Sequence, residues 1–215
     1  PTDRASLSAI ARFYESKKNF AEAERYLGKL AEVSSDKNAG RAQLIDLHAR
    51  DGKVDQAINE YRDLIKQRPK YLQAYAQLAG LLMGKGDFAG AFQQLEAGLK
   101  LDKQNTDLLL MRGRLNIASN KIRDAITDLE QVLKNEPKHS MGLYFMADAR
   151  VRDNDPERAR AYLNDLLKYY PDNPAGLLMR IRILLSQQNP SKDEFNEAVK
   201  TADKIITGIA YLRSN

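Results

Sequence analysis

The sequence predicts an all-α protein built from repeated helical hairpins, and a fixed spacing of 34 residues along the 215-residue chain is the main observation behind this prediction. An alanine recurs at this spacing, and a large apolar residue follows it four positions later in every repeat. A period of roughly 20 to 50 residues is typical of repeat proteins, in which each unit is one small supersecondary structure. The repeated alanines are Ala23, Ala57, Ala91, Ala125 and Ala159.

A helical pattern also precedes each alanine. In the first unit, apolar residues have the spacing i, i+3, i+4 and i+7, which places them on one side of a helix. They are Leu7, Ile10, Ala11 and Tyr14, and the third unit repeats the pattern over 75–82. We therefore expect one helix before the alanine and a second helix around it.

Turn residues separate the two predicted helices of a unit, and proline ends three of the second helices. The turns contain Gly or Asn, which can adopt the left-handed conformation that stops a helix. Proline stands twelve positions after the alanine in three units, where it cannot continue a helix. The turns are 51–53, 85–87, 119–121 and 153–155, and the prolines are Pro69, Pro137 and Pro171.

These signals predict six hairpins in a single array over 1–215. In the sixth unit, Pro174 after Asn173 suits a helix start. The matching alanine, Ala198, comes five positions late, so we expect a longer turn over 186–192. The predicted units are 4–37, 38–71, 72–105, 106–139, 140–173 and 174–212.

The 34-residue pattern resembles that of the tetratricopeptide repeat (TPR) family, whose unit reads W-x2-L-G-x2-Y, then A-x3-F, then P. The resemblance covers about the whole chain, although the first aromatic position is never Trp here. It implies a right-handed superhelical solenoid of about six hairpins. In such an array each unit packs only on its neighbours, and the first helices line a concave side.

The resemblance also implies a function, that of a scaffold or adaptor that binds a peptide or helix of a partner protein in the concave groove. Two alternatives stay open: an interaction module of a longer enzyme or of a secretion or envelope protein, and a self-assembling structural unit. Some family members grip a C-terminal carboxylate with Lys, Asn and Arg on successive first helices. Only Arg12 matches that pattern among the corresponding positions, so this clamp is not expected.

The groove is predicted in the C-terminal half of the chain, because the inward positions of units four to six carry large apolar residues. The same positions in units one to three are mostly small or polar. Apolar side chains on a solvent-facing wall indicate a binding site, and we expect Tyr144 to be its anchor. The alternative is that curvature buries these side chains against neighbouring first helices. The predicted groove residues are Leu110, Arg114, Ile117, Met141, Tyr144, Asp148, Val151, Leu178, Arg182 and Leu185.

The residue inventory argues against an enzyme, a cofactor and a metal site. The chain has no Cys and only two histidines, His48 and His139. We interpret His48 as a packing residue between paired helices and His139 as an exposed linker residue. The sequence contains no phosphate-binding glycine loop and no metalloprotease, hydrolase or calcium-loop motif.

Charged residues are interspersed along the chain, with 34 Lys and Arg against 29 Asp and Glu. This pattern predicts no nucleic-acid partner. Several acids are expected at the starts of second helices or on their outer faces, where they complement the helix dipole. They include Glu22, Asp124, Asp128 and Glu157. The Tyr169-Tyr170 pair is expected to close its hairpin against the next unit.

No stretch approaches eighteen apolar residues, so we expect a soluble chain without direct membrane insertion. The first residues lack the pattern of a signal peptide. Because the chain opens on Pro1 rather than Met, a missing targeting segment stays open, and so do cytoplasmic and extracytoplasmic locations. Self-assembly through the last helix also stays open, because no polar helix follows its apolar residues, which are Ile205, Ile206, Ile209 and Leu212.

Overall fold

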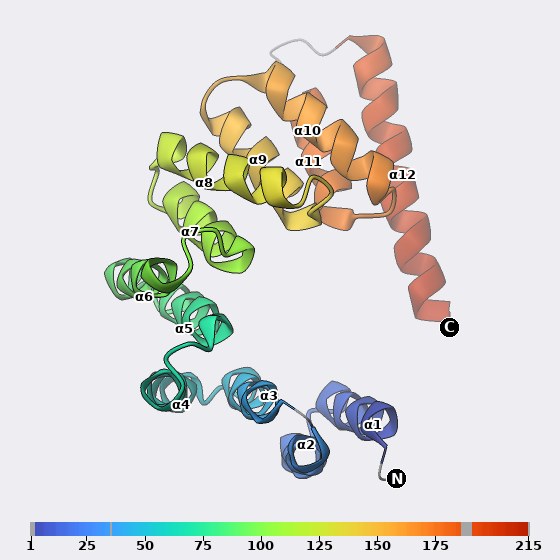
Figure 1. Ribbon diagram of the computed structural model, residues 1–215. Coiled ribbons are helices and arrows are strands. Elements are labelled where there is room, and N and C mark those ends of the chain that lie inside the picture. Colours follow the sequence, from blue (N-terminus) through green and yellow to red (C-terminus); the bar gives the residue numbers. More distant parts are fainter. Residues whose placement is uncertain (1–2, 35, 186–190, 215) are drawn as a thin grey trace. The chain divides into compact units, whose positions relative to one another are not determined.

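The computed structural model describes residues 3–34, 36–185 and 191–214, with side chains described up to residue 207. This part of the chain forms twelve helices and no strand (Figure 1). The predicted all-α class is confirmed, and the chain is a helical-repeat solenoid. The helices are α1 (Arg4–Ser16), α2 (Phe20–Val33), α3 (Lys37–Arg50), α4 (Val54–Gln67), α5 (Leu72–Gly84), α6 (Phe88–Leu101), α7 (Thr106–Ala118), α8 (Ile122–Asn135), α9 (Ser140–Arg152), α10 (Pro156–Tyr169), α11 (Pro174–Leu185) and α12 (Lys192–Ser214).

The chain divides into two compact units, 1–111 and 112–215, with the boundary inside α7. In the first unit, α1 packs on α2, α3 on α4 and α5 on α6, and the hairpins are joined by the packing of α2 on α3 and of α4 on α5. In the second unit, α8 packs on α9, α9 on α10, α10 on α11 and α11 on α12. Within each unit, neighbouring hairpins thus pack on one another.

The repeated alanines are core positions of their hairpins. All five have no exposed surface, and the large residue four positions after each alanine is also buried. A methyl side chain at this position lets the two helices approach closely. The 34-residue spacing of the sequence therefore corresponds to one core position in five successive hairpins.

The hairpin turns also repeat. One residue in each of five turns has a left-handed backbone with φ between 56° and 82°, and these residues are 34 positions apart. Gly52, Gly86, Asn120 and Asn154 fill four of them, as the sequence predicts. The first turn uses Lys18, although side chains other than Gly, Asn and Asp seldom adopt this conformation.

We expect Lys18→Gly to stabilise the protein by about 1 kcal/mol, because glycine adopts the left-handed conformation without a steric cost. Chemical denaturation should show a higher midpoint for this variant. Lys17→Gly is the matched control, because Lys17 has a φ of −88°. It should leave the midpoint unchanged or lower it, and an equal rise in both variants would contradict the explanation.

A buried tyrosine and a carboxyl group form a polar contact inside the second hairpin. The hydroxyl of Tyr61, which has no exposed surface, donates to Asp46 Oδ1 at 2.5 Å and to the Ala42 carbonyl at 3.2 Å. Burial raises the pKa of Asp46 above its usual range, and the hydrogen bond from Tyr61 partly opposes this effect. Burial and the neighbouring Asp46 raise the pKa of Tyr61.

The raised pKa of Asp46 makes the free energy of unfolding depend on pH. The folded state binds this proton more tightly than the unfolded state does, so the contribution of Asp46 is favourable at low pH and is lost as the pH rises through its folded pKa. Asp46→Asn keeps an acceptor for Tyr61 but does not titrate. We therefore expect wild type to become less stable relative to Asp46→Asn between pH 4 and pH 7, as measured by urea unfolding. A relative gain for wild type over this range would contradict the sign.

Candidate functional site

The predicted groove residues of α9 and α11 lie on adjoining faces within the second unit. Along each helix they recur every three or four residues, which places them on one side. Asp148 Oδ1 of α9 accepts a hydrogen bond from Arg182 Nη2 of α11 at 2.9 Å. We call this surface the α9–α11 face, formed by Met141, Tyr144, Asp148, Val151, Leu178, Arg182 and Leu185.

Three apolar residues of the α9–α11 face are open to solvent. Met141 and Leu185 are each 44% exposed, and Leu178 is 58% exposed. By contrast, Tyr144 and Val151 are half-buried and pack against the apolar core of the second unit. Met141, Leu178 and Leu185 therefore have large apolar surfaces available to a partner. Only part of the Tyr144 side chain is available, because the rest packs against the core.

The predicted groove residues of α7 do not share this exposure. Ile117 is 6% exposed, so its side chain belongs to the core rather than to a solvent-facing wall. Leu110 is half-buried and falls in the first unit. Arg114 is exposed and makes no hydrogen bond or ion pair within the described part of the chain.

A buried carboxylate organises the charges of the α9–α11 face. Asp148 is 8% exposed, and its second oxygen, Oδ2, accepts a hydrogen bond from Arg152 Nε at 2.9 Å. The side chains of Arg152 and Arg182 remain about half exposed. Sequence reasoning missed Arg152, although its i+4 spacing from Asp148 on a helix is a recognisable signal.

The prediction that Asp128 lies at a helix start or on an outer face is wrong. Asp128 is 4% exposed, and it accepts hydrogen bonds from Arg112 Nε at 2.9 Å, Arg112 Nη2 at 2.6 Å and Asn116 Nδ2 at 3.3 Å. It therefore lies between α7 and α8 rather than at a helix start or on an outer face. The other acids named with it, Glu22, Asp124 and Glu157, do lie in the first turns of their helices.

The two histidines have structural contacts. His48 is mostly buried, and its Nδ1 lies 2.8 Å from Glu60 Oε2 while its Nε2 lies 3.5 Å from Glu24 Oε1. It thus joins α3 to α2 and α4, in agreement with a packing role. His139 is not an exposed linker residue, because its half-buried ring caps α9 by accepting a hydrogen bond from the Gly142 amide at 3.1 Å.

Tyr170 makes a hydrogen bond to the loop that precedes its hairpin. The Tyr170 hydroxyl donates to the Lys138 carbonyl at 2.7 Å. This residue therefore contacts the preceding inter-unit loop, and the expected packing of the Tyr169-Tyr170 pair against the next unit stays a prediction. Within the described residues, no group of three His, Asp or Glu side chains is arranged to hold a metal ion.

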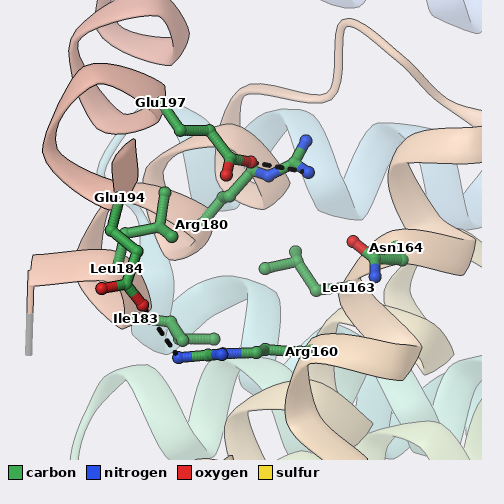
Figure 2. A pocket seen from close by; sticks show the side chains of 8 residues that line it. All are labelled: Arg160, Leu163, Asn164, Arg180, Ile183, Leu184, Glu194 and Glu197. Atoms are coloured by element: carbon green, nitrogen blue, oxygen red, sulfur yellow. Dashed lines mark ion pairs between the residues drawn. The ribbon is translucent and has the colours of Figure 1, made fainter. Parts of the chain in front are cut away.

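A cavity of about 220 Å³ lies between α10, α11 and α12 (Figure 2). Arg180 Nη2 lies 2.9 Å from Glu197 Oε1, and Arg160 Nη2 lies 3.7 Å from Glu194 Oε1. Both acids come from α12, and both arginines come from the helices beneath it. The charged groups lining the cavity thus neutralise one another and attach α12 to α10 and α11. The remaining lining residues are Leu163, Asn164, Ile183 and Leu184.

The helix α12 differs from the other second helices in length. It has 23 residues, whereas α10 has 14. Ala198 lies one turn further from the start of its helix than Ala159 does, and the added turn carries Glu194. The predicted long turn falls mostly on 186–190, outside the described residues. Ala198 itself is buried, as its match to the repeated alanine predicts.

None of the described helices combines the length and the apolar character that crossing a membrane requires.

The sequence matches the model of the tetratricopeptide repeat family over residues 48–115, 82–149 and 116–181, which together span more than half of the chain. Among proteins of known sequence, it is 29% identical to a TPR repeat-containing protein of Pseudomonas aeruginosa over 78% of this chain and 29% of that protein. It is 24% identical to the human protein O-mannosyl-transferase TMTC3 over 66% of this chain and 16% of that protein. The chain thus spans less than a third of either relative.

Among solved structures, the fold is similar to that in the crystal structure of the APC/C hetero-tetramer Cut9–Hcn1. The TM-score is 0.72 at 17% identity, over 95% of this chain and 42% of that one. The helical hairpins, the buried alanines at 34-residue spacing and the family match agree. The chain belongs to the tetratricopeptide repeat family and is a protein-interaction module of that kind.

Proposed function

We propose that the second unit binds a segment of a partner protein on the α9–α11 face. The observation that carries this proposal is the exposure of Met141, Leu178 and Leu185 on one face, each between 44% and 58%. A group of large apolar side chains that faces solvent is typical of an interaction site. Because these three side chains are not needed to fill the core, partner binding accounts for their presence.

The charges of the face add specificity to this proposal. Arg182 and Arg152 lie beside the exposed apolar residues and are held there by Asp148. Interfaces commonly combine an apolar centre with arginine. The similar structure was solved as a hetero-tetramer of Cut9 and Hcn1, which supports a role in protein association.

The proposal can be tested with a displayed library of random 16-residue peptides selected on the immobilised chain. We expect Leu178→Ser/Leu185→Ser to lose capture of the selected peptides. Val33→Ser/Leu101→Ser is the matched control, because both side chains are exposed, at 47% and 55%, and lie in the first unit. Circular dichroism checks folding. Equal capture by both double variants would overturn the assignment of the face.

The same face would serve a longer protein equally well. Since the chain spans 29% of its Pseudomonas relative and 16% of the human transferase, we propose that it can act as the interaction module of a larger polypeptide. The partner segment would then be recruited to whatever activity the rest of that polypeptide has.

Self-assembly through α12 is a second candidate, and one observation favours it. Phe195, Val199 and Ile206 are 54%, 45% and 64% exposed and lie along one side of α12. The side chains of Ile209 and Leu212 lie outside the described residues. Light scattering after size-exclusion chromatography should detect a dimer or larger species that Val199→Glu dissociates. A monomer at all concentrations would remove this candidate.

A further inference from the structure

The α9–α11 face carries a surplus of positive charge. Within the second unit, Arg152 and Arg182 place their guanidinium groups on or beside the face, where both are bonded to Asp148. Asp148 is the one acidic residue among the seven residues that define the face. Because Asp148 is buried and both of its oxygens accept hydrogen bonds from arginine, its charge is not available to a partner.

The arginines keep free hydrogen-bonding capacity. A guanidinium group has five N–H donors, and Arg152 and Arg182 each donate one hydrogen bond within the described residues, in both cases to Asp148. Their side chains are 48% and 54% exposed. The remaining donors are open to solvent beside exposed apolar side chains.

Asp148 acts as a positioning residue for these two groups. It joins an arginine of its own helix to an arginine of the next first helix. Holding both guanidinium groups in place lowers the conformational entropy that a ligand must remove when it binds them. Carboxylates are the protein groups that match guanidinium donors most closely.

We infer that the α9–α11 face recognises an acidic, apolar segment of its partner, with Asp or Glu side chains bound by Arg152 and Arg182 next to large apolar side chains bound by Met141, Leu178 and Leu185. This inference rests on the proposed function, because it names the chemistry of the partner of that same face. A basic segment would place like charges together on the exposed arginines, and an uncharged segment would leave the arginine donors unpaired.

The test uses the same random 16-residue peptide library on the whole chain, with the composition of the selected peptides as its first result. We expect enrichment in Asp and Glu together with Leu, Ile or Phe. A selected acidic peptide, and its analogue with Gln in place of Asp and Glu, are then titrated by fluorescence anisotropy. The acidic form should bind about tenfold more tightly or better, and the difference should shrink in 0.5 M NaCl because salt screens exposed charges.

Arg152→Gln/Arg182→Gln is the variant that separates recognition from folding, because it removes both guanidinium groups while the glutamine amide at position 152 can still donate to Asp148, as Arg152 Nε does. Circular dichroism checks that this variant folds. The variant should lose the preference for the acidic peptide and keep the affinity for the Gln analogue. Arg123→Gln/Arg158→Gln, which removes two exposed arginines of α8 and α10, is the control for net charge and should keep the preference.

The outcomes distinguish this inference from the proposed function. Selected peptides that are basic or uncharged, but that lose capture with Leu178→Ser/Leu185→Ser, would overturn the acidic partner and leave the binding face standing. The absence of enriched peptides, or capture that the leucine variants do not change, would overturn both.

Discussion

Arg112→Met should destabilise the protein by about 3 kcal/mol, because it leaves a buried carboxylate without its main partner. Asp128 is 4% exposed and accepts two hydrogen bonds from the Arg112 guanidinium, at 2.6 and 2.9 Å. Its other hydrogen bond, from Asn116, is longer at 3.3 Å. Urea unfolding at pH 7 measures the loss directly.

The unpaired charge, rather than lost packing, should account for most of this effect. Asp128→Asn in the Arg112→Met background removes the charge, while the amide oxygen can still accept from Asn116. We expect the double variant to recover at least half of the lost free energy of unfolding. A double variant as unstable as Arg112→Met alone would show that packing by the arginine stem dominates.

Ala125→Leu should cost about 1 to 3 kcal/mol, because it adds volume at a fully buried position of α8. Ala125 has no exposed surface. A Cβ atom added to Gly113 of α7 would lie 3.6 Å from the Ala125 carbonyl oxygen and 3.0 Å from Leu129. The contact with Leu129 is tight, which shows that α7 and α8 are closely packed beside the buried Ala125.

Arg123→Leu is the matched control, since it introduces the same side chain two residues earlier at an exposed position of α8. Thermal unfolding should show a clear fall in midpoint for Ala125→Leu and little change for Arg123→Leu. Equal effects would contradict the helical register that the 34-residue spacing predicts.

The fold could be predicted from the sequence because its main determinants are local and periodic. The small size of the repeated alanine, the left-handed turn at Gly52 or Asn120 and the apolar stripe of each first helix all act within one hairpin. The contacts of Asp128 could not be predicted in this way. Its burial depends on Arg112 and Asn116, which belong to another helix and stand at positions that the repeat pattern does not specify.

The candidate site shows the same limit. The spacing placed Met141, Leu178 and Leu185 on one side of their helices, and the structure exposes them. Spacing alone could not separate them from Ile117 and Tyr144, because curvature and the size of neighbouring side chains decide which inward residues are covered. The extra turn of α12 could not be predicted either. The match of Ala198 to the repeated alanine predicts where this helix packs, but it does not predict the residue at which the helix begins.

The most direct test of the α9–α11 face as the partner-binding surface is methyl NMR of the whole chain during titration with a library-selected peptide. The methyl signals of Met141, Leu178 and Leu185 should shift together and saturate at the same peptide concentration, while Leu101 of the first unit stays unchanged. Saturable shifts confined to other methyl groups, with these three unmoved, would contradict the account.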